Sequence, residues 1–293
     1  AASDVYKRQI FIGSENEGVF RSKNKGESFE HIGLPISKVK NIVFSSDSLI
    51  FVSTPSGVQK YNRIIRQWSN IGLQNVEAIS ITQNNTLFAG TFDDGLFKSN
   101  DFGKNWTLTN LTVDSLMSVY NVLAISDDTV FASTGQNLRL TTNGGVIWNA
   151  YPINTHFFSR GLFYTNKTIW CTGAGSENEI LYHSNNIGSF DSVSSGFLLP
   201  DENNALYVLK NNFVFIADPF RKGILRSTDG GKNLEQILFN KYNYTVFANE
   251  NGTVITESAS FSGQSDSVYF SSNFGNSWAV SYTHLTLPTK RIV

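Results

Sequence analysis

An eight-residue motif returns seven times along this chain, at steps of 38 to 44 residues. Its clearest copy, residues 99–106, reads Ser, Asn, Asp, Phe, Gly, Lys, Asn and Trp. The copies begin at Ser22, Tyr61, Ser99, Thr141, Ser184, Ser227 and Ser271. A period of this length indicates one supersecondary unit per repeat. The repeat therefore restricts the fold to a series of similar units.

The residues around each copy indicate what the unit is. In the third repeat, residues 78–81, 87–91 and 95–98 are rich in apolar and β-branched side chains, with turn residues between them. The same order of runs precedes the other copies. Four short strands in every ~40 residues are typical of a propeller blade. We therefore predict an all-β fold, a seven-bladed β-propeller of four-stranded antiparallel blades, with the motif between the third and fourth strands.

Turn chemistry explains the residue types of the motif. Asn or Asp at the third position can accept hydrogen bonds from the backbone of the turn, and Gly at the fifth supplies a positive φ. A closing Trp or Phe is expected to begin the outer strand and to pack over the hairpin. The structural residues predicted in this way are Ser22, Asn24, Gly26 and Phe29; Trp68; Ser99, Asp101, Gly103 and Trp106; Thr141, Asn143, Gly145 and Trp148; Ser184, Asn186, Gly188 and Phe190; Ser227, Asp229 and Gly231; and Ser271, Asn273, Gly275 and Trp278.

This pattern resembles the Asp-box, or bacterial neuraminidase repeat, of sialidases, xyloglucanase-type glycosidases, sortilin-like receptors and photosystem II assembly factors. The resemblance implies that each box is a structural turn on the outer rim, remote from any ligand. It extends along almost the whole chain but concerns the repeat alone, so it implies no chemistry.

The two ends of the chain break the repeat. Residues 1–9 and 281–293 look like translated sequencing adapter from an environmental, metagenomic gene fragment. We therefore expect a single propeller over residues 10–280, in which blade one lacks its inner strand and blade seven has a shortened outer strand. The propeller is expected to be monomeric within a longer chain.

Composition limits the classes of partner. A net charge of -1 gives no electrostatic reason to expect nucleic acid, and no apolar run is long enough for membrane insertion. The single cysteine, Cys171, lies in an apolar run and is interpreted as a buried hydrophobe. The histidines are scattered, so neither a metal nor a cofactor is expected. Richness in Asn, Ser, Thr and Gly resembles exported proteins and suggests a secreted or cell-surface location.

A ligand is expected on the face of the ring opposite the boxes, where the links between blades and the second-to-third-strand turns lie. An unknown protein or a carbohydrate is the expected ligand. The candidate residues on these loops are Phe92, Asp93, Asp94, His156, Phe158, Arg160, Phe220, Arg221, Tyr242 and Glu257.

Each enzyme alternative requires particular residues in the sequence. A sialidase requires three arginines around a substrate carboxylate, and only Arg160 and Arg221 lie on the candidate loops. A xyloglucanase-type hydrolase requires two carboxylates, for which Asp93 or Asp94 with Asp218 is the candidate pair. An assembly-factor-like role would use an arginine-rich patch, and this face offers few arginines. The sequence favours a non-catalytic binding or scaffold module, with a carbohydrate-active propeller and an assembly-factor-like propeller as alternatives.

Overall fold

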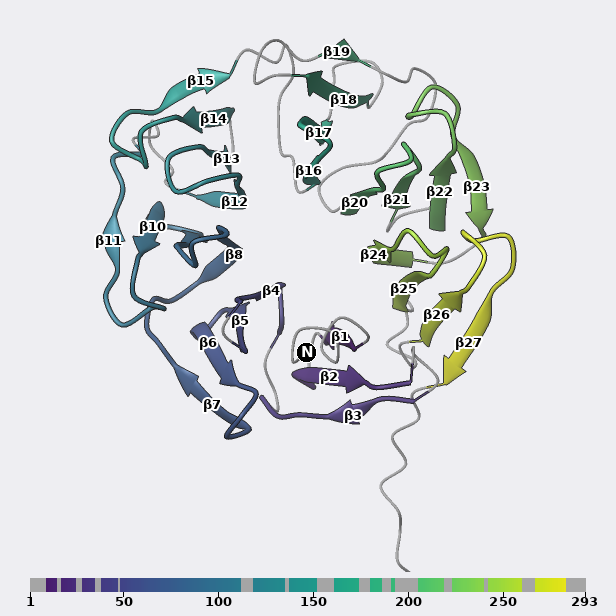
Figure 1. Cartoon of the computed structure of the whole chain (residues 1–293), viewed down its shortest axis with the longest axis horizontal. Coiled ribbons are helices and arrows are strands. Elements are labelled where there is room, and N and C mark those ends of the chain that lie inside the picture. The colour runs from purple at the N-terminus through teal and green to yellow at the C-terminus, as the bar shows by residue number, and fades with distance from the viewer. Residues whose placement is uncertain are drawn as a thin grey trace, which may run out of the picture.

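The computed structural model is a ring of seven antiparallel sheets around a central axis (Figure 1). It describes residues 9–14, 17–24, 28–34, 38–46, 48–111, 118–134, 137–151, 161–173, 180–185, 191–192, 205–218, 223–239, 242–259 and 267–282. These ranges contain 27 strands and no helix. The predicted all-β, seven-bladed propeller is confirmed.

Each sheet is a simple antiparallel meander. The strands of blades one to four are β1 Ile10–Gly13, β2 Val19–Ser22, β3 Glu30–His31, β4 Asn41–Phe44, β5 Leu49–Thr54, β6 Gly57–Asn62, β7 Gln67–Asn70, β8 Val76–Ile81, β9 Leu87–Thr91, β10 Leu96–Ser99, β11 Thr107–Leu108, β12 Val119–Ala124, β13 Val130–Thr134, β14 Leu138–Thr141 and β15 Asn149–Tyr151. Those of blades five to seven are β16 Leu162–Thr165, β17 Thr168–Gly173, β18 Ile180–Asn185, β19 Asp191–Ser192, β20 Ala205–Val208, β21 Val214–Asp218, β22 Gly223–Ser227, β23 Glu235–Leu238, β24 Tyr242–Ala248, β25 Val254–Ala259, β26 Ser267–Ser271 and β27 Ala279–Tyr282.

Six blades have four strands, the first nearest the axis and the fourth on the rim (Figure 1). Blade one has three described strands, in the order β1-β2-β3. The pairing register identifies β1 as the counterpart of the second strand in the other blades. Ile10 of β1 pairs with Ser22, the first residue of its box, just as Leu87 of the second strand β9 pairs with Ser99, the first residue of the third box.

The outer strand of blade seven, β27, is four residues long, like β7 and β23. It pairs with β26 as far as Tyr282, two residues beyond the expected end at Val280. This strand is therefore not shortened as the sequence suggested, because Ser281 and Tyr282 continue the ladder.

The core lies between neighbouring blades. Second strands such as β9 and β13 are buried along their whole length, because a blade packs against each of their faces. A phenylalanine recurs in the second strand, where it pairs with the residue just before the box. Phe51, Phe88, Phe131 and Phe215 occupy this position and are all fully buried. Burial of such a ring contributes about 1.5–3 kcal/mol. Stability therefore depends on contacts between units about 40 residues apart.

The two faces of the ring carry different loops. Box turns share one face with the first-to-second-strand turns, as shown by hydrogen bonds from Gly144 N to Asp128 O and from Gly230 N to Asn212 O. The opposite face carries the second-to-third-strand turns and the links between blades, where Phe92 N donates to Asn75 O. We call this second surface the link face.

Candidate functional site

The boxes form closed networks of short-range hydrogen bonds. In the third blade, Ser99 Oγ donates to Asp101 Oδ1 at 2.8 Å and accepts from Gly103 N at 2.9 Å. Asp101 also accepts from Asn105 N at 2.9 Å. These bonds, those from Asn105 above all, lower the pKa of Asp101 from 3.8 to about 2. The box of Asp229 has the same pattern and the same lowered pKa, about 2.

The box tryptophans connect blades. Trp106 Nε1 donates to Ile71 O of the preceding blade at 2.8 Å, Trp68 to Ile32 O at 2.7 Å and Trp278 to Ile237 O at 2.9 Å. The Trp68 ring also packs on Tyr61 of its own hairpin, with ring centroids 4.8 Å apart, so the bond to the neighbouring blade adds to the expected packing. Trp148 differs, since it donates to Gly145 O of its own box at 3.2 Å.

The box glycines make room for the preceding blade. Gly103 has a φ of 79°, and a Cβ added there would lie 2.2 Å from Ile71 Cδ1. At Gly275 the corresponding atom is Ile237 Cδ1, also at 2.2 Å. This position requires glycine for two reasons, the positive φ and the close packing of the preceding blade.

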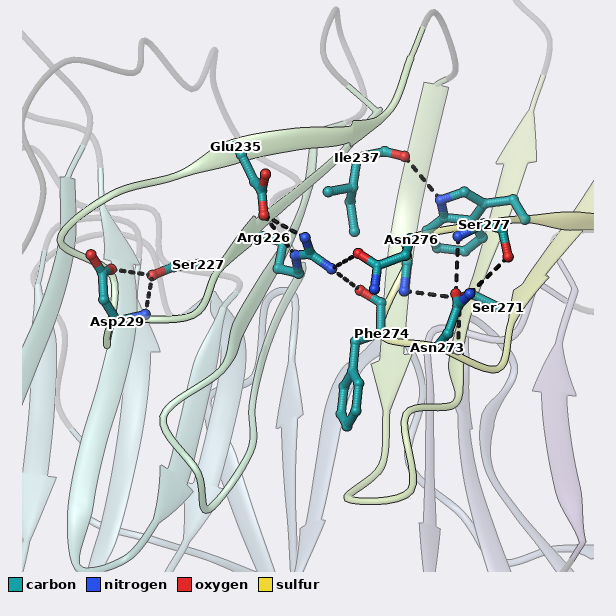
Figure 2. A network of polar contacts seen from close by, with 12 residues as sticks. Arg226, Ser227, Asp229, Glu235, Ile237, Ser271, Asn273, Phe274, Asn276 and Ser277 are labelled. Atoms are coloured by element: carbon teal, nitrogen blue, oxygen red, sulfur yellow. Dashed lines mark hydrogen bonds and ion pairs between the residues drawn. The ribbon is translucent and has the colours of Figure 1, made fainter.

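A cation beside one box bridges two blades. Arg226 Nη1 donates to Phe274 O and to Asn276 Oδ1 of blade seven, each at 2.7 Å, and Arg226 Nε donates to Glu235 Oε1 of its own blade at 2.9 Å (Figure 2). Sequence reasoning missed this role. The available signal was a cation just before several boxes, at Arg21, Lys60, Lys98 and Arg226.

Several predicted box residues fall outside the described ranges, namely Gly26, Asn186, Gly188 and Phe190. Asn24 accepts from Ser28 N at 3.0 Å, and Asn143 and Asn273 accept in the same way from Ile147 N and Ser277 N. Phe29 is half-buried at the start of the outer strand region of blade one. The box turns therefore lie on one face as a structural feature that joins blades.

The link face holds a pocket of about 380 Å³ between blades two and three. It is lined by Ser56, Asn70, Gly72, Leu73, Gln74, Thr91, Asp94 and Phe97. The Asn70 side chain donates to Ser56 O at 3.0 Å and accepts from Gly72 N at 2.9 Å, so it fixes one wall. Thr91 Oγ1 accepts from Asp94 N at 3.0 Å and holds the turn that forms the other wall.

Phe92, Asp93 and Asp94 stand together on that turn, and all three are exposed. The Phe92 ring lies 6.3 Å from the Tyr120 ring in an edge-on arrangement, and Phe92 O accepts from Ser118 Oγ of the following link. Neither Asp93 nor Asp94 has an ion-pair partner within the described part of the chain. The turn therefore presents two carboxylates beside an exposed aromatic ring.

For the other predicted ligand residues, a place at this site stays a prediction. His156, Phe158, Arg160, Phe220 and Arg221 lie outside the described residues, and for Tyr242 and Glu257 only the strand backbone is described. One ion pair on the same face was not predicted: Lys40 Nζ with Glu77 Oε1, which joins blades two and three and is mostly buried.

Among the described residues there is no group of three metal-ligating side chains and no helix long and apolar enough to cross a membrane. The arginines described are Arg21, Arg139 and Arg226 on third strands and Arg63 and Arg66 in a box turn. Burial raises the pKa of the Cys171 thiol far above its ordinary value, which keeps it protonated.

A ring of four-stranded blades pinned by these boxes defines an Asp-box β-propeller. A family model described as the BNR-Asp box repeat matches residues 96–109. No curated protein matches the sequence.

Solved structures resemble the fold. The extracellular domain of the hybrid two-component system BT4673 from B. thetaiotaomicron has a TM-score of 0.68 and 15% identity, covering 85% of this chain and 35% of that one. This chain thus spans about a third of its length. YCF48 bound to D1 peptide has a TM-score of 0.65 and 11% identity, with 84% and 81% coverage. YCF48 from Cyanidioschyzon merolae has a TM-score of 0.62 and 14% identity, with 85% and 87% coverage. At such low sequence identities, the TM-scores show a shared fold and nothing more.

Proposed function

We propose that this propeller is a non-catalytic binding module that recognises basic residues of a protein partner on its link face. The observation that carries the proposal is the turn of residues 92–94. It places the exposed carboxylates of Asp93 and Asp94 next to the exposed ring of Phe92, at the edge of the pocket between blades two and three.

This combination suits a guanidinium or ammonium group. A cation can pair with a carboxylate while its flat or apolar part lies on an aromatic face, which contributes about 0.5–1 kcal/mol at an exposed site. An exposed ion pair contributes a similar 0.2–1 kcal/mol. Because each contact is weak, a specific partner must engage several of them together with the pocket.

One wall of the pocket has little free hydrogen-bonding capacity. Both groups of the Asn70 amide are already hydrogen-bonded within the wall, so a ligand would be recognised mainly by Phe92, Asp93 and Asp94. The solved structure of YCF48 with D1 peptide is a propeller of this fold with a peptide ligand, which supports the same kind of partner here.

We also propose a secreted or cell-surface location for the module. This proposal is supported by the exported-type composition and by the extracellular domain among the structural neighbours.

The test is selection of 12-residue peptides from a random library on the full chain, followed by measurement of their affinities. We expect enrichment of Arg and Lys, together with an about two- to fivefold loss of affinity for Asp94→Asn and for Phe92→Ala, which corresponds to about 0.5–1 kcal/mol per contact. Asp128→Asn is the matched control, because it removes an exposed carboxylate on the box face. Peptides without basic residues, or equal affinity for all variants, would contradict the proposal.

A further inference from the structure

The pocket between blades two and three has both satisfied and free polar side chains. The Asn70 amide and the hydroxyls of Ser56 and Thr91 are already hydrogen-bonded within the chain. The Gln74 amide and the Asp94 carboxylate make no hydrogen bond or ion pair within the described part of the chain, and both residues are exposed. A ligand in the pocket can therefore form its polar contacts with these two side chains.

The two free side chains come from different segments that are bonded to each other. Gln74 belongs to the link between β7 and β8, whereas Asp94 belongs to the turn between β9 and β10. Phe92 N of the turn donates to Asn75 O of the link at 2.9 Å. Because Asn75 directly follows Gln74 and Phe92 is two residues before Asp94, this bond holds the free amide and the free carboxylate beside the same pocket.

Two apolar side chains complete the recognition surface of the pocket. Leu73 is half-buried and packs against the apolar cluster of blades two and three, and Phe97 is half-buried on β10. The volume of about 380 Å³ is at the lower end of the roughly 300–1,000 Å³ that is typical of ligand pockets. The pocket therefore suits one long side chain with an apolar stem and a cationic end.

Arginine fits this arrangement better than lysine. A guanidinium is planar and has five N–H donors, so it can pair with the Asp94 carboxylate and donate to the Gln74 amide oxygen at the same time. Its flat face can also lie on an aromatic ring such as Phe97. A lysine ammonium is a strongly hydrated point charge, so it would gain chiefly from Asp94.

We propose that the pocket between blades two and three receives one arginine side chain of the protein partner. Its guanidinium lies between Asp94 and Gln74, and its alkyl stem lies on Leu73 and Phe97. This inference rests on the proposed function. It adds that arginine is selected over lysine and that Gln74 makes the selection.

Three peptides of the form acetyl-Gly-Ser-Gly-X-Gly-Ser-Gly-amide are the probes, where X is arginine, lysine or citrulline. Citrulline has the shape of arginine without its positive charge. NMR titration of the full chain measures the affinities, since it detects dissociation constants in the millimolar range. We expect the arginine peptide to bind about three- to tenfold more tightly than the lysine peptide, as one additional hydrogen bond would give. The citrulline peptide should bind more weakly than either.

Two glutamine variants locate the selection. Gln74→Ala should weaken binding of the arginine peptide about three- to tenfold and have little effect on the lysine peptide. Because the Gln74 side chain is exposed, its removal should leave the fold intact. Gln83→Ala is the matched control and should keep the preference, because Gln83 is an exposed glutamine of the same blade in the turn between β8 and β9 on the box face.

The outcomes separate this inference from the proposed function. Equal binding of the arginine and lysine peptides would overturn the inference alone, as would a preference for arginine that Gln74→Ala retains. Absence of binding by both basic peptides would overturn the inference and the proposed function together. Binding of the citrulline peptide as tight as that of the arginine peptide would also overturn both, because neither allows recognition without a positive charge.

Discussion

The guanidinium of Arg226 in blade six donates a hydrogen bond to the carbonyl oxygen of Phe274 in blade seven at 2.7 Å. Phe274 belongs to an Asp-box turn and has a φ of 56°, so the bond fixes a turn of unusual conformation from the neighbouring blade. The box is therefore a joint between blades as well as a turn within one.

Arg226→Gln is expected to lower the free energy of unfolding by about 1–2 kcal/mol, because it removes charge-assisted hydrogen bonds to Phe274 O and Asn276. Denaturant titration followed by tryptophan fluorescence measures the change. Lys232→Gln removes a positive charge from an exposed position of the box in the same blade and should change stability by less than about 0.5 kcal/mol. Equal effects of the two substitutions would contradict a stabilising contact between Arg226 and blade seven.

Trp106→Ala is expected to destabilise the protein by about 3 kcal/mol, the low end for a large aromatic residue, because its ring is only half-buried. Trp106→Phe keeps most of the apolar contact but loses the bond to Ile71 O, which should cost about 1 kcal/mol. Thermal and denaturant unfolding distinguish the two variants. If Phe were as harmful as Ala, the indole N–H bond would be the main contribution of the residue.

Gly103→Ala is expected to destabilise by more than 1 kcal/mol, through a positive φ and a clash with Ile71 Cδ1. Ile71→Val removes that Cδ1 atom. The double variant should therefore lose less stability than the sum of the two single variants, which a double-mutant cycle measures. Strict additivity would show that the backbone conformation alone requires glycine here.

The boxes of Asp101 and Asp229 should make stability acid-sensitive. Both carboxyl groups have a folded-state pKa of about 2, lowered from 3.8 chiefly by hydrogen bonds from Asn105 and Asn233. A lowered pKa contributes stability that is present above the ordinary value and is lost as the pH falls from about 4 to about 2. Unfolding titrations between pH 5 and pH 2 follow this loss.

Asn at the same box position gives a matched control, because Asn24, Asn143 and Asn273 occupy it in other blades. The double variant Asp101→Asn with Asp229→Asn should lose less stability between pH 4 and pH 2, whereas Asn273→Asp should lose more. An unchanged pH profile in both variants would show that other groups control acid unfolding.

Cys171 should react with thiol reagents only when the protein unfolds. The residue is fully buried in β17, and its burial raises the pKa of the thiol. Reaction of the Cys171 thiol with a disulfide reagent that releases a coloured product should therefore be slow in native buffer and fast in denaturant. Fast labelling of the native protein would indicate local opening of blade five.

Part of the candidate site could be predicted from the sequence. The position of each box within its repeat indicates which turns face away from it, and that argument pointed to residues 91–94. It could not identify Asn70 and Gln74 as the facing wall, because they belong to the link from the preceding blade. Trp106 was recognised as a motif residue, but its partner Ile71 lies 35 residues earlier and in no recognisable pattern.

The sequence by itself determined the unit of this protein: a box at seven regular positions, most copies having the Ser or Thr, Asn or Asp, and Gly that close a turn through local hydrogen bonds, with strands at fixed distances before them. Such contacts involve residues at most a few positions apart, so they can be read from the repeat. The tertiary structure decided how the units meet, including the reach of Arg226 to Phe274 and the approach of Ile71 to Gly103. These features depend on packing between blades, which fixes distances in space that the spacing of residues along the chain does not.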